Sequence, residues 1–342
     1  MVTLRDVAER ASVSTATVSR VLRGSQTRVP ISEETRRRVL QASEELDYQP
    51  NAAARSLVSR CAGTIALLIP PRSQRLGYKF FFHLKLPEFL SGVEEITSAA
   101  GYRLLLQTAD DSFVRGRGMV RLWRSRIVDG FLQYNTEQMG DLRALECPAL
   151  TVNFRAENVL DNYIVADHIA GASAAVNHLV SLGHRRIAYI KGANSGFVTA
   201  ERTRGYYQAI AAHGLEPLVM EGDFTEENGY LATQALMART EPPTAIFAGS
   251  DLMAIGVIRA VFDSGLKVPQ DMAVIGSDGI ELTGYTNPPL TTVLTPMIDM
   301  ARLATTRLLE LIKGERAAPV QEVIQTRLVL RRSCGYQGPV LE

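Results

Sequence analysis

The chain has 342 residues, of which 37 are Lys or Arg and 36 are Asp or Glu, and 46% of its residues are hydrophobic. This length predicts two or three domains, and the composition excludes disordered and fibrous proteins. No segment reaches the roughly 18 uncharged apolar residues of a membrane span, and the charged first ten residues do not resemble a signal peptide. Three widely spaced cysteines, Cys61, Cys147 and Cys334, favour a reducing cytoplasm and argue against a disulfide framework or a zinc site.

Residues 1–48 predict an N-terminal all-α domain of three short helices. Thr3 and Asp6 have the spacing of a capping box, Ser14 can cap a second helix, and Ser32 can cap a third, which we expect Pro50 to stop. Two short helices across a tight turn, braced by a third, form a helix-turn-helix. The apolar residues expected on the inner faces are Leu4, Val7, Ala8, Ala11, Val18, Val21, Leu22, Val39, Ala42 and Leu46.

The charge pattern and the second helix point to DNA. The first 60 residues have an excess of three positive charges, all of them from Arg, whereas the remainder has an excess of two negative charges. Thr15 and Ala16 lie in the turn of the helix that meets base edges, and Arg20 can donate two hydrogen bonds to guanine. A small helical bundle with a polar surface is the alternative. The predicted DNA contacts of this domain are Thr3, Ser14, Thr15, Ala16, Thr17, Ser19, Arg20 and Arg23.

Residues 49–61, QPNAAARSLVSRC, predict a hinge helix or linker. Asn51 can cap a helix of about two turns, which is far below the roughly 12 residues that an isolated helix needs. Its small side chains, among them Ala54, allow a close approach to another surface. Leu57 is an apolar side chain of the kind that enters base steps of the minor groove. A plain linker is the alternative interpretation.

Beyond residue 62, short apolar runs alternate with helical stretches. The runs are TIALLIP (64–70), YRLLLQTA (102–109), DGFLQYN (129–135), ALTVNF (149–154), RIAYIKG (186–192), TAIFAGS (244–250) and AVIGSDG (273–279). Such runs predict parallel strands buried on both faces and a doubly wound α/β architecture. Ligands in these folds lie beyond the carboxyl ends of the strands, where several runs end in polar residues. These residues are Tyr134, Asn135, Asn153, Ser250, Asp251, Ser277 and Asp278.

The segments VTLRDVAERASVSTATVSRVL (2–22) and YQPNAAARSL (48–57) closely resemble the LacI/GalR family of bacterial transcription regulators. The resemblance continues through GHRRIAYIKG (183–192), ERTRGYYQAI (201–210), PTAIFAGSDLMAIGVIRA (243–260), VPQDMAVIGSDG (268–279) and PPLTTVLTP (288–296). It implies a homodimer that binds a pseudo-palindromic DNA operator, most often as a repressor, with Leu57 inserted at the centre of the site. It also implies a core like that of periplasmic binding proteins, made of two doubly wound parallel-sheet subdomains with a ligand cleft between them. The expected core spans residues 62–342, with an N-subdomain at about 62–165 and 294–324 and a C-subdomain at about 166–293 and 325–342.

The same resemblance implies an effector site, with a sugar or sugar derivative as ligand. Arg202 matches the family arginine that grips the effector, and Asp278 matches the aspartate that accepts ligand hydroxyls; a structural salt bridge is the alternative for both. The implied effector-binding residues are Tyr134, Asn153, Arg202, Ser250, Asp251, Asp278 and Thr295.

Several positions depart from the family pattern. Ser12 stands where glycine is usual, and a positive φ there would strain serine by about 1 kcal/mol. Val58 replaces a basic residue of some members, the loop SQTRVPIS (25–32) is longer, and GSDG (276–279) lacks an aromatic residue. The segment 71–92 carries cationic side chains that would favour an anionic ligand, although a solvated loop is the simpler alternative. These side chains are Arg72, Arg75, Lys79, His83 and Lys85.

No catalytic or nucleotide-binding motif in the sequence supports an enzymatic function. The sequence has no phosphate-binding GxxxxGK[ST], no complete GxGxxG and no GxSxG. Its five histidines show no metal-ligand spacing, so we expect neither a metal nor a cofactor. A periplasmic solute-binding protein is the main rival, against which the N-terminal domain and the missing signal peptide argue, and a sugar kinase would need the absent nucleotide motif. The short tail after Cys334 has no leucine heptads, which favours a dimer over a tetramer.

Overall fold

The computed structural model describes residues 2–23, 31–48, 61–71, 85–135, 146–155, 161–193 and 196–339. The chain divides into two compact units, residues 1–63 and 64–342, and each is described by itself. The predicted hinge contacts Asn51, Ala54 and Leu57 lie outside the described residues, as does Val58. So do Arg72, Arg75, Lys79 and His83 of the basic segment, whereas Lys85 is described.

The first unit is the predicted three-helix domain, with α1 (Leu4–Arg10), α2 (Thr15–Arg23) and α3 (Glu33–Glu45). The capping box of Thr3 and Asp6 is present, Ser14 Oγ accepts from Thr17 N at 3.1 Å, and Ser32 caps α3. The apolar side chains predicted to point inward pack into one core. One detail differs, because α3 ends at Glu45 and Leu46 is its C-cap, so the helix stops before Pro50 is reached.

The turn between α1 and α2 confirms the expected strain at Ser12. Its φ is +54°, in the left-handed region that glycine adopts without cost. The serine therefore holds a backbone conformation that its side chain disfavours.

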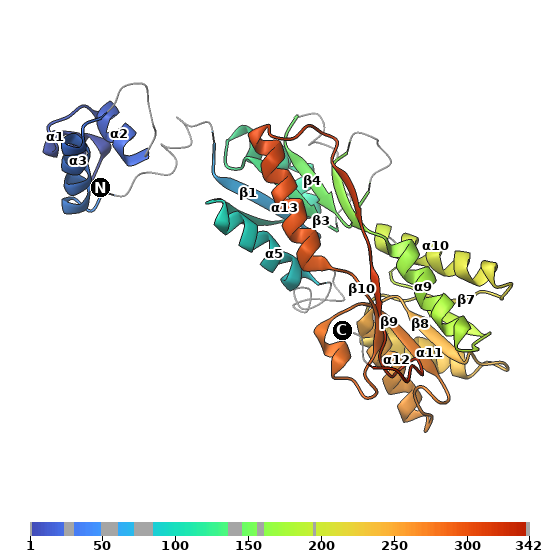
Figure 1. The fold of residues 1–342 in the computed structure, drawn as a ribbon. Coiled ribbons are helices and arrows are strands. Elements are labelled where there is room, and N and C mark those ends of the chain that lie inside the picture. Colours follow the sequence, from blue (N-terminus) through green and yellow to red (C-terminus); the bar gives the residue numbers. More distant parts are fainter. Residues whose placement is uncertain are drawn as a thin grey trace. The chain divides into compact units, whose positions relative to one another are not determined.

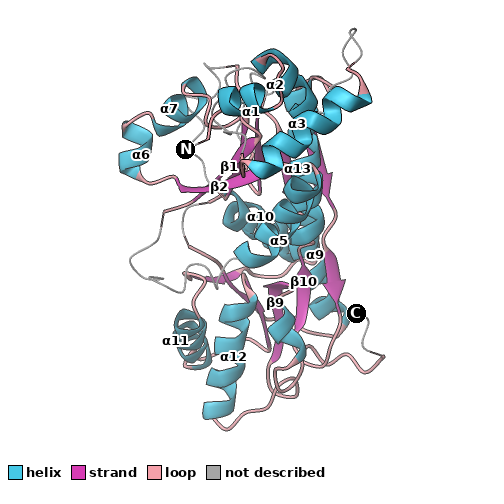
Figure 2. Ribbon diagram, turned by 90° about the vertical axis from the view of Figure 1, so that its left-hand side faces the viewer, coloured by secondary structure: helices cyan, strands magenta, loops and turns pink. Residues whose placement is uncertain are grey.

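The second unit contains two six-stranded sheets (Figures 1 and 2). The first has the order β11-β5-β4-β3-β1-β2 and the second β12-β10-β9-β8-β6-β7. The bounds in the first sheet are β1 Thr64–Ile69, β2 Arg103–Thr108, β3 Gly130–Tyr134, β4 Ala149–Val152, β5 Tyr163–Ala166 and β11 Gln321–Ile324. Those in the second are β6 Ile187–Ile190, β7 Leu218–Met220, β8 Ala245–Ala248, β9 Ala273–Asp278, β10 Thr291–Leu294 and β12 Arg327–Val329.

The seven apolar runs all form strands, and helices cover both faces of each sheet, which confirms the doubly wound α/β architecture (Figure 1). On the first sheet, α5 (Leu86–Ala99) and α13 (Met297–Lys313) share one core, and α7 (Gly118–Arg124) contributes to the core of the other face, beside α6 (Asp111–Arg115). On the second sheet, α9 (His168–Ser181) and α10 (Phe197–Ala212) share one core, and α11 (Glu226–Met237) and α12 (Asp251–Asp263) share another. We call the first sheet with its helices the first lobe, and the second sheet with its helices the second lobe.

Two features differ from a set of parallel strands buried on both faces. β2 lies at the edge of its sheet, and none of its residues is fully buried. β12 pairs antiparallel with β10, whereas all other described pairs are parallel. The chain passes between the lobes after β5, after β10 and after β11, so three connections join them.

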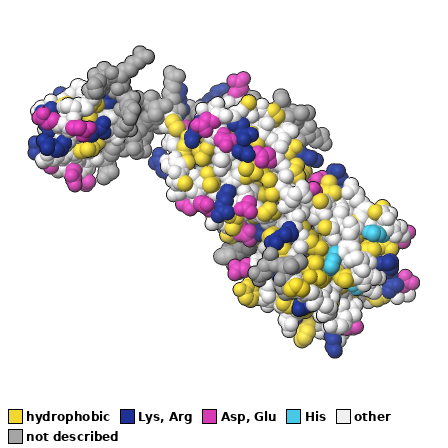
Figure 3. All heavy atoms as spheres, viewed as in Figure 1, with side chains coloured by type: hydrophobic (Ala, Val, Ile, Leu, Met, Phe, Trp, Pro, Cys, Tyr) yellow, Lys and Arg dark blue, Asp and Glu magenta, His cyan; other side chains and the backbone are white. Residues whose placement is uncertain are grey.

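The described surface mixes both signs of charge. On the face shown in Figure 3, acidic and basic side chains are interspersed over the second unit, as its near-neutral charge leads one to expect. Among the described residues, no helix combines the length and the apolar character that crossing a membrane requires.

Candidate nucleic-acid interface and ligand site

The start of α2 presents short polar side chains to solvent. Ser14, Thr15 and Ala16 are exposed, and Thr17 is half-buried. The hydroxyls of Ser14 and Thr17 lie 2.9 Å apart, and Ser14 also caps the helix. These hydrogen bonds stabilise the first turn of α2, and the outer surface of this turn stays accessible to a partner.

Arg20 lies one turn further along α2. Its Nε donates to Ala16 O at 3.3 Å, which orients the guanidinium along the helix. The two terminal nitrogens have no hydrogen-bond partner among the described residues, so they can still donate to a base or a phosphate. Ser19 is half-buried, Thr3 is exposed and serves in the capping box, and the side chain of Arg23 lies outside the described residues.

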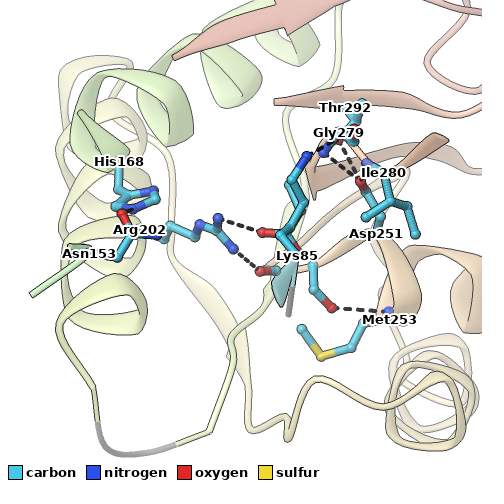
Figure 4. Close-up of polar contacts among 12 residues, drawn as sticks. Lys85, Asn153, His168, Arg202, Asp251, Met253, Gly279, Ile280 and Thr292 are labelled. Atoms are coloured by element: carbon cyan, nitrogen blue, oxygen red, sulfur yellow. Dashed lines mark hydrogen bonds and ion pairs between the residues drawn. The ribbon is translucent and has the colours of Figure 1, made fainter. Parts of the chain in front are cut away.

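In the second unit, the predicted effector-binding residues gather at the carboxyl ends of the strands. Tyr134 and Asp278 are the last residues of β3 and β9, whereas Asn153, Ser250 and Thr295 follow β4, β8 and β10. Figure 4 shows some of the contacts that hold this region. Both sheets contribute, because Tyr134 and Asn153 belong to the first lobe and Ser250 and Asp278 to the second.

Arg202, from α10, is the centre of one buried contact set. Its Nη1 donates to Gly249 O at 2.6 Å, and its Nη2 donates to Asp278 Oδ1 at 2.7 Å (Figure 4). The side chain of Arg202 is 4% exposed and that of Asp278 is 23% exposed. The salt bridge considered from the sequence is therefore present. Because part of Asp278 remains exposed, its carboxylate can accept from a ligand as well as from Arg202.

Asn153 and His168 form a second contact. Asn153 Oδ1 lies 3.3 Å from His168 Nε2, and both side chains are buried. Burial and, secondarily, the positive charge of Arg202 lower the pKa of His168 well below its ordinary value. The imidazole is therefore neutral, and its Nε2 can donate to Asn153 when the proton is on that nitrogen. His168 begins α9 directly after the chain passes from the first lobe to the second.

Asp251 and Ser250 stabilise the wall of the site from within. Asp251 Oδ2 accepts from Gly279 N at 2.6 Å and Ile280 N at 2.8 Å, and Thr292 Oγ1 donates to Oδ1 at 2.5 Å. Burial raises the pKa of Asp251 to about 7. The negative charge of Asp278 also raises this pKa, whereas the three hydrogen bonds lower it. Ser250 Oγ accepts from Met253 N and caps α12. Their effector contacts stay predictions.

Tyr134 is fully buried and stacks on Phe89 of α5, with ring centroids 4.6 Å apart. Burial raises the pKa of Tyr134, and the charges of Asp278 and Glu88 add to this rise. The tyrosine therefore stays protonated and is a hydrogen-bonding side chain of fixed orientation, placed near charges from both lobes.

Three buried polar atoms near these residues have no hydrogen-bond partner within the described part of the chain. They are Asn135 Oδ1, Arg202 Nε and Thr295 Oγ1. Buried polar atoms are normally paired, so a ligand or water that reached these three atoms could complete the network. The set includes an acceptor, a donor and a hydroxyl that can do either.

Three further residues at this place were not predicted as effector contacts. Lys85, at the start of α5, donates to Gly279 O at 3.3 Å, and His168 contacts Asn153. Phe224 has a φ of +70° and its ring lies against Gly192, where a Cβ would be 2.0 Å from the ring. Sequence patterns gave no reason to choose His168 or Phe224, because a lone histidine and a lone phenylalanine are more often parts of a core.

No group of three or more His, Cys, Asp or Glu side chains that could hold a metal ion occurs among the described residues. Cys147 and Cys334 are free thiols.

Comparisons with known proteins match both units. Residues 3–51 match the family described as bacterial regulatory proteins, lacI family, and residues 176–334 match the periplasmic binding protein-like domain. The chain is 33% identical to the catabolite control protein A of Priestia megaterium, over 97% of this chain and 99% of that protein. A structure of the Lac repressor dimer bound to operator and an anti-inducer superposes with a TM-score of 0.85 at 28% identity, over 97% of this chain and 99% of that one. A complex of the transcriptional regulator CelR with cellobiose gives 0.71 at 32% identity, over 97% and 100% of the two chains.

Proposed function

Because the chain belongs to the LacI family of bacterial regulatory proteins and is a transcriptional regulator and not an enzyme, we propose that it is a repressor. As a homodimer it binds a pseudo-palindromic operator through residues 1–48, with a hinge at 49–61. A small ligand bound between the lobes controls this binding. We propose the subdomain boundaries that the resemblance implies, and the expected site of action is the bacterial cytoplasm.

The DNA-binding part of the proposal rests on α2. Its exposed first turn and the orientation of Arg20 leave donors on one surface of a small helical unit. We assign base contacts to Thr15, Ala16 and Arg20, and phosphate contacts to Ser14, Thr17, Ser19 and Arg23, with Thr3 at the start of α1. Asn51, Ala54 and Leu57 are assigned to the minor groove at the centre of the operator.

The ligand part of the proposal rests on the polar atoms at the strand ends. Arg202 Nε and Thr295 Oγ1 are buried without a partner in the described residues, and Asp278 is partly exposed beside them. Sugar hydroxyls donate and accept, so they match this mixture better than a ligand that only accepts. The aromatic ring of Phe224 is a further candidate surface for a sugar. We assign direct contacts to Tyr134, Asn153, Arg202, Asp278 and Thr295, and a supporting role to Ser250 and Asp251.

The dimer is supported by apolar side chains at the surface of the second lobe. Leu282 and Tyr285, in and after the short helix η2 (Glu281–Gly284), are 59% and 79% exposed. A second copy that covered these side chains would remove their apolar surface from water. A twofold dimer in turn requires an operator with two related half-sites.

Selection of bound sequences from a random pool of double-stranded DNA tests the proposal. The purified protein should enrich a twofold-symmetric sequence with two half-sites, and the binding should weaken steeply as salt rises. An enriched site without twofold symmetry would contradict the dimeric mode, and no enrichment above random DNA would contradict the repressor function itself.

A further inference from the structure

Lys85 is a buried cation in an unfavourable position. Its side chain is 4% exposed, so the ammonium has lost nearly all of its water. It is the N-cap residue of α5 with a φ of +57°, a conformation that non-glycine residues disfavour. A positive charge at the start of a helix also opposes the helix dipole. These three costs indicate that the contacts of the ammonium have a purpose beyond starting a helix.

Two contacts compensate the charge. Lys85 Nζ lies 2.7 Å from Glu88 Oε2 in the first turn of the same helix. It also donates to Gly279 O at 3.3 Å, and Gly279 belongs to the second lobe (Figure 4). The side chain therefore joins the start of α5 to the end of β9, two segments that are 194 positions apart in sequence.

The acceptor of this contact is itself fixed. The amides of Gly279 and Ile280 both donate to the buried carboxylate of Asp251. A side chain at Gly279 would collide with Leu294, since an added Cβ would lie 2.4 Å from Leu294 Cδ1. The carbonyl of Gly279 is thus a rigid point of the second lobe, directly after the predicted ligand contact Asp278.

We propose that Lys85 is a positioning residue that bridges the two lobes and holds the segment 279–284 against the start of α5. The relevance of this bridge to regulation rests on the proposed function, because the bridge ends beside the predicted ligand residue Asp278. The bridge itself does not depend on DNA or on any ligand. A hydrogen bond from a charged donor is strong enough to change the population of the locally opened segment by about tenfold.

Hydrogen exchange of the full-length, ligand-free protein tests the bridge without DNA. In Lys85→Met, backbone amides of both 86–90 and 279–284 should exchange about tenfold faster than in the wild type. A defect confined to the start of the helix would change only 86–90. Lys85→Arg keeps the cation and should preserve the protection of 279–284.

Two control variants separate the bridge from general loss of charge. Glu88→Gln removes the ion pair but keeps the bridge, so it should spare 279–284. Lys191→Met removes another lysine at the carboxyl end of a strand, which pairs with Glu221 inside the second lobe, and should leave both segments unchanged.

Unchanged exchange of 279–284 in Lys85→Met would overturn the proposal. Equal acceleration in Lys85→Met and Lys85→Arg would also overturn it, because loss of the cation would then not be the cause of the faster exchange. This comparison still applies if Lys85→Met is globally destabilised. Since no DNA is present, a failure here leaves the repressor proposal to be judged by the selection of DNA sequences.

Discussion

Polar side chains are exposed at the start of α2, whereas those of the cluster at the carboxyl ends of the strands in the second unit are mostly buried. In α2, Ser14 and Arg20 form only local hydrogen bonds and leave their outer surface to solvent. In the cluster, Arg202 and Asp251 are buried, and their hydrogen bonds also hold the backbone. An exposed residue of α2 can therefore be changed with little effect on folding, whereas a residue of the cluster has a structural and a binding role at once.

The largest expected effect on stability comes from Asp251→Ala. The substitution leaves two backbone amides and the Thr292 hydroxyl without their acceptor, at about 1–3 kcal/mol for each unsatisfied group. We expect a loss of about 3 kcal/mol or more in the free energy of unfolding, measured by chemical denaturation. Asp263→Ala, in the last turn of the same helix and exposed, is the matched control and should stay within about 0.5 kcal/mol. A loss as small as that of the control would show that Asp251 does not hold the segment.

Arg20→Ala should weaken DNA binding and leave stability nearly unchanged, the converse of Asp251→Ala. We expect operator binding to weaken by about 1–3 kcal/mol with relaxed specificity at one base position of each half-site, while stability changes by less than about 0.5 kcal/mol. Fluorescence anisotropy with operator and random DNA of equal length measures both affinities. Equal weakening on the two DNAs would mean that Arg20 contacts only phosphate.

The buried histidine adds a pH dependence to the cluster. The pKa of His168 is lowered in the folded state, so below about pH 6.5 the unfolded chain binds a proton that the folded chain does not. Stability should fall with decreasing pH at up to about 1.4 kcal/mol for each pH unit from this residue. His168→Gln stays neutral at all pH values, so its unfolding free energy should fall less steeply between pH 6.5 and 4.5. Parallel curves for the two proteins would contradict the assignment.

The smallest effect is expected at Ser12. Ser12→Gly relieves about 1 kcal/mol of strain but increases the entropy of the unfolded chain by a comparable amount, so the net change should be below about 0.5 kcal/mol. Ser12→Val places a β-branched residue at the same positive φ and should destabilise by more than about 1 kcal/mol. Thermal unfolding of the two variants compares them directly, and equal melting temperatures would show that the turn carries no strain.

The helical unit and the main strands could be predicted because their signals are local. Thr3, Ser14 and Ser32 each cap a helix by accepting from a backbone amide three positions along the chain. Continuous apolar runs predict β1, β3 and β8. The strands that were missed, β5, β7, β10, β11 and β12, have at most four residues each and gave no comparable run. Their pairing with neighbouring strands, rather than their own sequence, defines them.

The site was predictable only in part. The strand-end rule located Tyr134, Asn153 and Asp278 without any contact information. It could not show that Asp251 points into the wall toward Gly279 and Thr292, because that depends on residues 28 and 41 positions away. The bridge from Lys85 also escaped prediction as a contact, since its acceptor is a backbone carbonyl that no sequence motif marks.

The most direct measurement is a titration of the selected operator with the wild-type protein, in the absence and in the presence of a sugar found to raise its melting temperature. Coupling between ligand and DNA should change the operator dissociation constant by about 5–150-fold, and DNA should change the affinity for the sugar by the same factor. Arg202→Ala, once shown to be folded, should still bind the operator but lose this response. Identical operator affinities with and without the bound sugar in the wild type would contradict a ligand-controlled repressor.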